Sequence, residues 1–92
     1  MREPTDQEIL DILAEECAEV IHVISKIRRF GIDDKHPKTG IPNHVKLNLE
    51  VDDLDTMIEW AQERGILEAY DDVTWESTAD AKRDKVRRYL RD

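Results

Sequence analysis

The sequence has 92 residues, of which 39% are hydrophobic and another 39% are charged. A chain of this length forms one small domain, residues 1–92, and is only marginally able to bury a core by itself. The hydrophobic share is too high for a disordered chain, so we expect a helical protomer that completes its core by self-association. The net charge is −8, with −11 on residues 1–76 and +3 on residues 77–92. The acidic body argues against binding to DNA or RNA, and the basic end either balances that body or binds a small anion.

The first predicted helix covers residues 6–29. Thr5 and Glu8 have the spacing of a capping box, in which each side chain accepts a hydrogen bond from the backbone of the other. Gly31 follows a basic stretch and is suited to end the helix. Apolar residues recur through the segment with a helical period, at Ile9, Ile12, Leu13, Val20, Val23, Ile24 and Ile27.

Residues 30–43 contain two glycines and two prolines and keep no hydrophobic period, so they are predicted to form a loop. The length is near the upper limit for a connection without secondary structure in a compact domain, which favours a role in contacting a ligand.

Two further helices are predicted. Asn43 is a suitable cap for a helix over residues 44–64, which Gly65 then ends. The serine–threonine pair at 77–78 is a suitable cap for a third helix over residues 78–91. The predicted fold class is therefore all-α: an antiparallel helical hairpin followed by a shorter C-terminal helix, assembled into a bundle by oligomerisation.

Two pairs of carboxylates fall in phase on the two longer helices. At about 100° per residue, Glu16 lies in the middle of the apolar stripe of its helix, and Glu19 lies about 60° to one side. Glu50 and Asp53 repeat this pattern on the second helix, with the same offset to the same side. In an antiparallel hairpin the two pairs reach similar heights, so all four carboxylates are predicted to converge.

Such a cluster predicts a divalent cation. Burying a carboxylate costs several kcal/mol, roughly, and neighbouring like charges add to this cost. Oxygen ligands favour Mg²⁺, with Mn²⁺ as a substitute. The alternative is that the helical phases are wrong and these four residues lie on the surface.

The carboxylates also carry a resemblance to a known family. The segments Glu-Glu-Cys-Ala-Glu at 15–19 and Glu-Val-Asp-Asp at 50–53 resemble the EExxE…ExxD signature of the MazG-like, all-α nucleoside triphosphate pyrophosphohydrolases. The resemblance covers residues 5–65. It implies a Mg²⁺-dependent enzyme that cleaves a nucleotide between its α and β phosphates to give a monophosphate and pyrophosphate. It also implies assembly as a homodimer or a homotetramer.

Residue by residue, Glu16 and Glu19 match the metal ligands of the family's first motif, and Glu50 and Asp53 match those of the second. Glu15 matches the leading glutamate and is expected to support catalysis from outside the apolar stripe. In the implied mechanism, one or two ions neutralise charge on the triphosphate and activate a water for in-line attack. The carboxylates hold the ions and accept a proton, so no nucleophilic side chain is needed.

Several residues are candidates for binding the substrate. Lys85 and Arg88 lie in a Lys-Val-Arg-Arg stretch that resembles a phosphate-contacting segment of the family. Lys46 lies about 40° from Glu50 around its helix, where it either reaches a phosphate or extends beside the apolar stripe. Trp60 either stacks on a base or packs in a core.

The long loop adds Lys35, His36 and Lys38, which either cover the phosphates or are simply solvated. Glu19 and His22 have the spacing of half a di-iron motif. The second helix offers no matching histidine, so a ferritin-like oxidase is not favoured.

The remaining features of the sequence exclude several classes of protein and site. Cys17 is the single cysteine, which excludes an internal disulfide and a cysteine-rich zinc site. No apolar run has the length of a membrane span or of a signal-peptide core, so we expect a cytoplasmic protein. Two alternatives to a nucleotide pyrophosphohydrolase stay open: a hydrolase of another phosphorylated nucleotide, such as a guanosine alarmone, and a non-catalytic acidic helical module that binds a protein partner.

Overall fold

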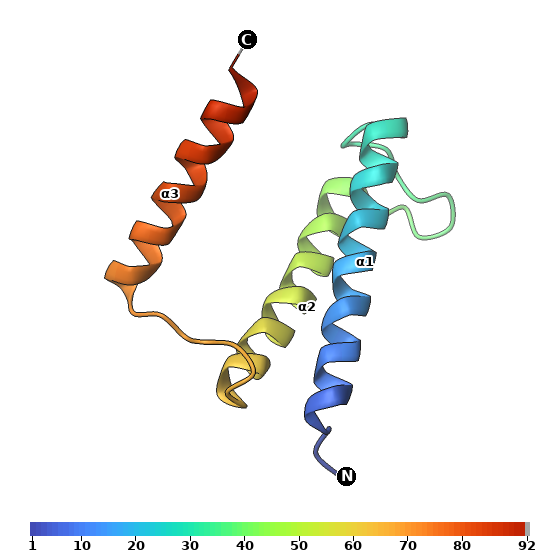
Figure 1. The fold of residues 1–92 in the computed structure, drawn as a ribbon. Coiled ribbons are helices and arrows are strands. Elements are labelled where there is room, and N and C mark those ends of the chain that lie inside the picture. Colours follow the sequence, from blue (N-terminus) through green and yellow to red (C-terminus); the bar gives the residue numbers. More distant parts are fainter. Residues whose placement is uncertain (92) are drawn as a thin grey trace.

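The computed structural model describes residues 1–91 and is built from three helices (Figure 1). They are α1 (Asp6–Phe30), α2 (Asn43–Glu63) and α3 (Asp72–Leu90). Helices α1 and α2 lie side by side and run in opposite directions, whereas α3 stands apart from both. Within the described residues there is no β-strand; Lys35 and Pro42 form an isolated antiparallel bridge in the loop. The all-α prediction is confirmed.

The start and end of α1 follow the sequence signals. The backbone N–H of Glu8 donates to the Thr5 hydroxyl at 3.1 Å, and the Thr5 N–H donates to the Glu8 carboxylate at 3.0 Å. Gly31 ends the helix at φ +100°, a conformation that favours glycine. Its N–H donates to the Ile27 carbonyl at 2.8 Å, so both predicted ends of α1 are confirmed, with Phe30 as its last residue.

Asn43 does not cap α2 as predicted. The helix begins at Asn43 itself, after Pro42, whose fixed φ and missing N–H suit the start of a helix. The Asn43 amide instead donates to the Gly31 carbonyl at 2.9 Å, and its backbone N–H donates to the Asp34 carbonyl at 2.8 Å. Asn43 therefore joins the end of α1 and the loop to the start of α2.

The prediction for the start of α3 was wrong. The helix begins at Asp72 rather than at residue 78, and the Asp71 carboxylate caps it by accepting the Thr74 N–H at 2.7 Å. The pair at 77–78 lies inside the helix. An aspartate cap with a second aspartate in the first turn is as strong a start signal as a serine or threonine.

The other end of the hairpin is tied by Arg64. Its guanidinium pairs with the Asp6 carboxylate at 2.8 Å and donates to the Pro4 carbonyl at 2.8 Å. Together with the contacts of Asn43, this connection sets the register between α1 and α2 from both ends.

The buried core is small and belongs to the hairpin. Among residues 1–91, four apolar side chains are buried, and they are Ile9, Val23, Met57 and Ala61. In contrast, α3 has no buried residue and contacts neither α1 nor α2 in the described part of the chain. Trp75 of α3, an aromatic residue of the kind that often packs between helices, is 61% exposed in the single protomer.

No helix within residues 1–91 combines the length and the apolar character needed to cross a membrane.

Candidate metal centre

Three of the predicted carboxylates meet between α1 and α2. Glu16 of α1 and Glu50 and Asp53 of α2 each offer an oxygen, and these oxygens all lie within 4.8 Å of one another. Glu50 is buried, Glu16 is half-buried and Asp53 is exposed. The cluster thus extends from the hairpin seam outward to solvent on the Asp53 side.

The helical period explains why these side chains converge. Glu16 falls in the row of α1 that also supplies the buried Ile9 and Val23, and Glu50 falls in the row of α2 that supplies Met57 and Ala61. Packing the two apolar rows together therefore carries one carboxylate from each helix into the seam. Asp53 lies three residues after Glu50 and is its neighbour on the helix surface.

Two of the buried oxygens have no hydrogen-bond partner. They are one carboxylate oxygen of Glu16 and one of Glu50, and no donor within residues 1–91 reaches either of them. The other oxygen of Glu50 pairs with the Lys46 ammonium at 2.8 Å. Buried polar atoms are rarely left unpaired, because losing water without a new partner costs about 1–3 kcal/mol per group. A divalent cation fits this site, because it would supply both oxygens with a partner and oppose the clustered negative charge.

The charges of the cluster act mainly on Glu16. Burial raises the pKa of the Glu16 carboxyl, and repulsion from Asp53, Glu50 and Glu15 raises it further. Glu15 itself is exposed and lies outside the three-residue cluster. Its charge therefore affects the pKa of Glu16 from outside the apolar stripe, where the helical period places it.

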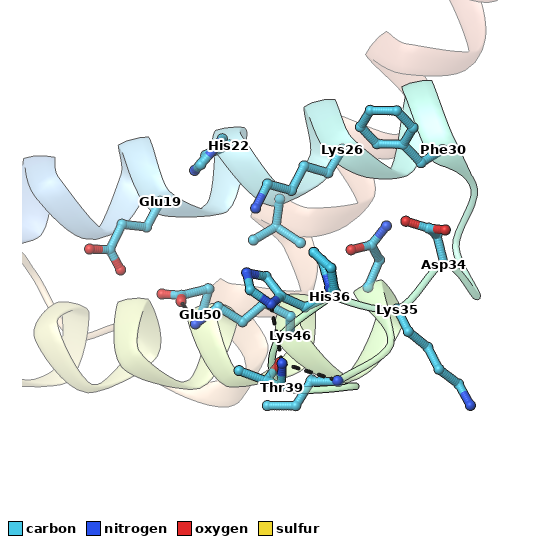
Figure 2. Close-up of a pocket in the computed structure, with 14 residues that line it drawn as sticks. Glu19, His22, Lys26, Phe30, Asp34, Lys35, His36, Thr39, Lys46 and Glu50 are labelled. Atoms are coloured by element: carbon cyan, nitrogen blue, oxygen red, sulfur yellow. Dashed lines mark hydrogen bonds and ion pairs between the residues drawn. The ribbon is translucent and has the colours of Figure 1, made fainter.

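Glu19, the fourth predicted ligand, lies beside Glu50 at the edge of the cluster. Its side chain points toward Glu50 across the seam (Figure 2). The close approach of the Glu50 carboxylate, with repulsion from Glu50 and Glu16, raises the pKa of Glu19. The hydrogen bond from the Lys46 ammonium is the largest of the effects that lower the pKa of Glu50.

A pocket of about 620 Å³ opens directly beside these carboxylates. It lies between the second half of α1, the loop and the first turns of α2, with Glu19 and Glu50 at one end and Phe30 and Asp34 at the other (Figure 2). Five basic or imidazole side chains line it: His22, Lys26, Lys35, His36 and Lys46. The pocket therefore combines positively charged and imidazole side chains with the two carboxylates at its end.

The loop that forms one wall of the pocket is held by its own hydrogen bonds. The His36 N–H donates to the Ile41 carbonyl at 3.0 Å, and the His36 imidazole accepts from the N–H groups of Lys38 and Thr39 at 3.1 and 3.3 Å. Gly40 adopts φ +71°, which allows the chain to turn back. The turn brings His36 to the pocket, whereas Lys35 lines its edge with the ammonium group pointing away (Figure 2). Lys38 does not line the pocket.

The predicted substrate-binding residues fall in different places. Lys46 lines the pocket. Trp60 is half-buried and packs against the core cluster that contains Met57 and Ala61. Lys85 and Arg88 are exposed on α3, which does not contact the hairpin in the described chain. A single protomer therefore brings only Lys46 of these four residues to the carboxylates.

Sequence reasoning missed Lys26 and Phe30 as lining residues. Lys26 follows Glu19 by two helical turns and lies about 20° from it around α1, so the helical period contains the signal. Phe30 follows Lys26 by one further turn on the same side.

A scan against models of protein families finds no match, and neither do comparisons with curated proteins and with solved structures.

Proposed function

We propose that this chain is a Mg²⁺-dependent nucleotide pyrophosphohydrolase of the MazG-like family, which converts nucleoside or deoxynucleoside triphosphates to monophosphates and pyrophosphate. The observation that carries the proposal is the meeting of Glu16, Glu50 and Asp53 within 4.8 Å, with two buried oxygens that have no partner. A structural ion pair would not leave these oxygens bare, because burying a carboxylate is tolerated only when the group is paired.

Glu16, Glu50 and Asp53 would hold the ion, while Glu19 approaches Glu50 from outside this three-residue cluster. All donors are carboxylate oxygens, which suit the hard ions Mg²⁺ and Mn²⁺. When bound, the ion would neutralise charge on the phosphates and lower the pKa of the attacking water.

The side chains around the pocket supply the remaining requirements of phosphoryl transfer. Lys26 and Lys46 provide positive charge beside the carboxylates (Figure 2), which a triphosphate needs for binding and for orientation. A raised pKa suits a group that takes a proton near neutral pH, and the pKa of Glu19 is raised by its neighbours. Glu19 is therefore the candidate to accept the proton of the attacking water.

Self-association belongs to the same proposal. Three aliphatic residues of α1 are at least 42% exposed, and they are Leu10, Ile21 and Ile24. Since a small core contributes little stability, covering these residues with a further copy of the chain would complete the bundle.

A product assay tests the proposed reaction. Purified protein is incubated with Mg²⁺ and each nucleoside triphosphate, and the expected products are the monophosphate and pyrophosphate. Glu50→Gln should abolish the activity, whereas Glu59→Gln should retain it, because Glu59 lies about 180° around α2 from Glu50. Formation of a diphosphate and orthophosphate would contradict the proposed cleavage site.

The second candidate is a non-catalytic interaction module, and one observation favours it. Trp75, Val73 and Tyr89 of α3 are 61%, 80% and 86% exposed, and large exposed apolar residues are typical of surfaces that bind a partner. No product from any nucleotide, including guanosine alarmones, combined with no binding of Mg²⁺ or Mn²⁺, would favour this candidate over the enzyme.

A further inference from the structure

A second apolar row runs along α1, apart from the row that packs against α2. Its members are spaced at helical intervals and all are exposed, and they are Leu10, Ala14, Cys17, Ile21 and Ile24. The row lies roughly 80–160° around the helix from Glu16. Because it follows one side of the helix for most of its length, it is a continuous surface rather than a set of scattered residues.

Helix α2 extends this surface. Three half-buried residues of α2 lie roughly 40–100° around the helix from Glu50, on the flank opposite Asp53. They are Val51, Leu54 and Ile58. In an antiparallel pair, the flanks that carry Glu19 and Asp53 face the same side of the hairpin. The two apolar rows therefore share the other side, which we name the outer face.

We propose that the outer face of one protomer packs against the outer face of a second copy, about a two-fold axis that passes close to Cys17 and runs perpendicular to α1. This inference does not rest on the proposed enzymatic activity. Two-fold contacts are the commonest in homo-oligomers, and they require a surface that is complementary to itself. The outer face meets this requirement in its pattern of charges.

The charges at the ends of the row fix the direction of the pairing. Asp6 lies at the N-terminal end of the row and Arg28 at the C-terminal end. Antiparallel pairing places Asp6 opposite the partner's Arg28, whereas parallel pairing would place like charges together. Asp6 already pairs with Arg64 through one oxygen, and Arg28 makes no ion pair within the described residues. Arg28 is therefore available to a second copy.

The middle of the row allows the helices to approach closely. With Ala14 and Cys17 at the centre, two α1 helices can pack at the lower end of the usual axial distance of roughly 8–10 Å. Facing Cα atoms on the two helices are then about 4–5 Å apart, a distance at which a disulfide can form. Two Cys17 residues would meet at the axis.

The paired outer faces leave the pocket open. Glu19, His22 and Lys26, which line it from α1, lie on the flank of the helix opposite the row. The dimer would therefore have two pockets that face away from each other.

Oxidative cross-linking tests the position of the axis. Mild oxidation at low protein concentration should link the chains through Cys17 into a dimer that a reductant separates. The matched control is Cys17→Ala combined with Asp11→Cys, which moves the thiol to another exposed position of α1. The two introduced thiols would be about 18 Å apart along the paired helices and should not link. Failure of Cys17 to link, or equal linking in the control, would overturn the proposal.

The mass of the protein in solution tests the face itself. Sedimentation should give about twice the chain mass of 10.8 kDa, or a multiple of that dimer. Ile21→Glu should reduce the mass to that of a smaller assembly, and its circular dichroism should stay helical because Ile21 is 66% exposed in the protomer. Val45→Glu introduces the same charge on the opposite flank of the hairpin and should leave the cross-link and the Ile21-dependent assembly intact. A dimer that survives Ile21→Glu but is lost in Trp75→Glu would place α3 at the contact and contradict the proposal.

Charge exchange tests the direction of pairing. Arg28→Glu should weaken dimerisation about tenfold, in the range measured for close charge pairs at interfaces. Combining Asp6→Arg with Arg28→Asp should recover most of that loss. Arg29→Glu, one position along and about 100° around the helix, should have little effect. No rescue in the double variant would exclude the antiparallel pairing.

Discussion

The hairpin and α3 are both amphipathic, yet only the hairpin has a fixed tertiary position. Helix α2 has 21 residues and α3 has 19, so length does not distinguish them. α2 is tied to α1 through Asn43 at one end and Arg64 at the other. α3 is held by local interactions: the Asp71 cap and two ion pairs, Asp80–Arg83 and Asp84–Arg87, both at 3.0 Å.

The difference teaches that local signals are sufficient to form a helix but do not place it. Placement requires an apolar row on each partner together with contacts that fix the register, and both are present between α1 and α2. In the single protomer, the exposed Trp75 and Tyr89 of α3 find no such partner among the described residues. The candidate metal ligands that come together in the protomer all belong to the hairpin.

The largest expected effect is a difference in activity between two aspartate variants, one in the hairpin and one in α3. Asp53→Asn should lower pyrophosphohydrolase activity at least about 100-fold. Mutation of a residue that only orients a metal ligand already lowers metal affinity or activity about 10–100-fold. Asp84→Asn, the same change on α3, should leave the activity unchanged, because Asp84 pairs with Arg87 away from the cluster. Steady-state assays at saturating Mg²⁺ measure both. Equal losses in the two variants would mean that α3 belongs to the active site.

A smaller effect should distinguish the lysines. Lys26→Met and Lys46→Met remove charge from the pocket and should each raise KM roughly tenfold, as expected from losing one charge-assisted hydrogen bond. Lys85→Met should change KM little if each protomer acts alone. A comparable rise in KM for Lys85→Met would instead show that α3 of a neighbouring copy reaches the pocket. That result would also support the phosphate-binding role that the family resemblance implies for Lys85 and Arg88.

The response of stability to pH should report on the buried carboxylates in metal-free protein. The pKa values of Glu16 and Glu19 are raised above the ordinary 4.5 in the folded chain, so folding takes up protons. The free energy of unfolding in a chelator should therefore fall as the pH rises from about 4.5 through the folded values. Glu8, with its pKa lowered to about 2 by Arg2, acts in the opposite sense, and its contribution is lost only as the pH falls below 4.5.

Glu16→Gln should make the metal-free protein melt at a higher temperature near neutral pH and should flatten this pH dependence. Thermal unfolding followed by circular dichroism between pH 5 and pH 8 would check it. A variant that melts lower than the wild type across this range would contradict the view that the Glu16 charge is uncompensated.

The smallest expected effect concerns α3 alone. Asp71→Ala removes the cap and should cost about 1 kcal/mol of helix stability, seen as a loss of helical signal with little change in the melting of the hairpin. Ser77→Ala should have less effect on helix content, because Ser77 lies inside α3. Cooperative destabilisation of the hairpin by Asp71→Ala would show that α3 is coupled to it.

Much of the hairpin could be predicted because its signals are local and periodic. The capping box at Thr5, the stop at Gly31 and the phases of Glu16 and Glu50 are all readable from spacing. The start of α3 was missed because Asp71 was not recognised as a cap when a serine–threonine pair lay nearby. The ion pair of Lys46 with Glu50 also follows from spacing, because residues four apart are neighbours on a helix. The turn that brings His36 to the pocket depends instead on contacts within the loop, which no periodicity encodes.

Titration of the protein with Mn²⁺, followed by calorimetry and by electron paramagnetic resonance, tests the carboxylate centre most directly. The wild-type chain should bind the ion, melt at a higher temperature when it is bound, and release it to excess Mg²⁺. Glu50→Gln should bind it at least about tenfold more weakly, and Glu59→Gln should bind it as the wild type does. A wild-type chain that neither binds Mn²⁺ nor gains stability from millimolar Mg²⁺ would contradict the assignment of Glu16, Glu50 and Asp53 as a metal centre.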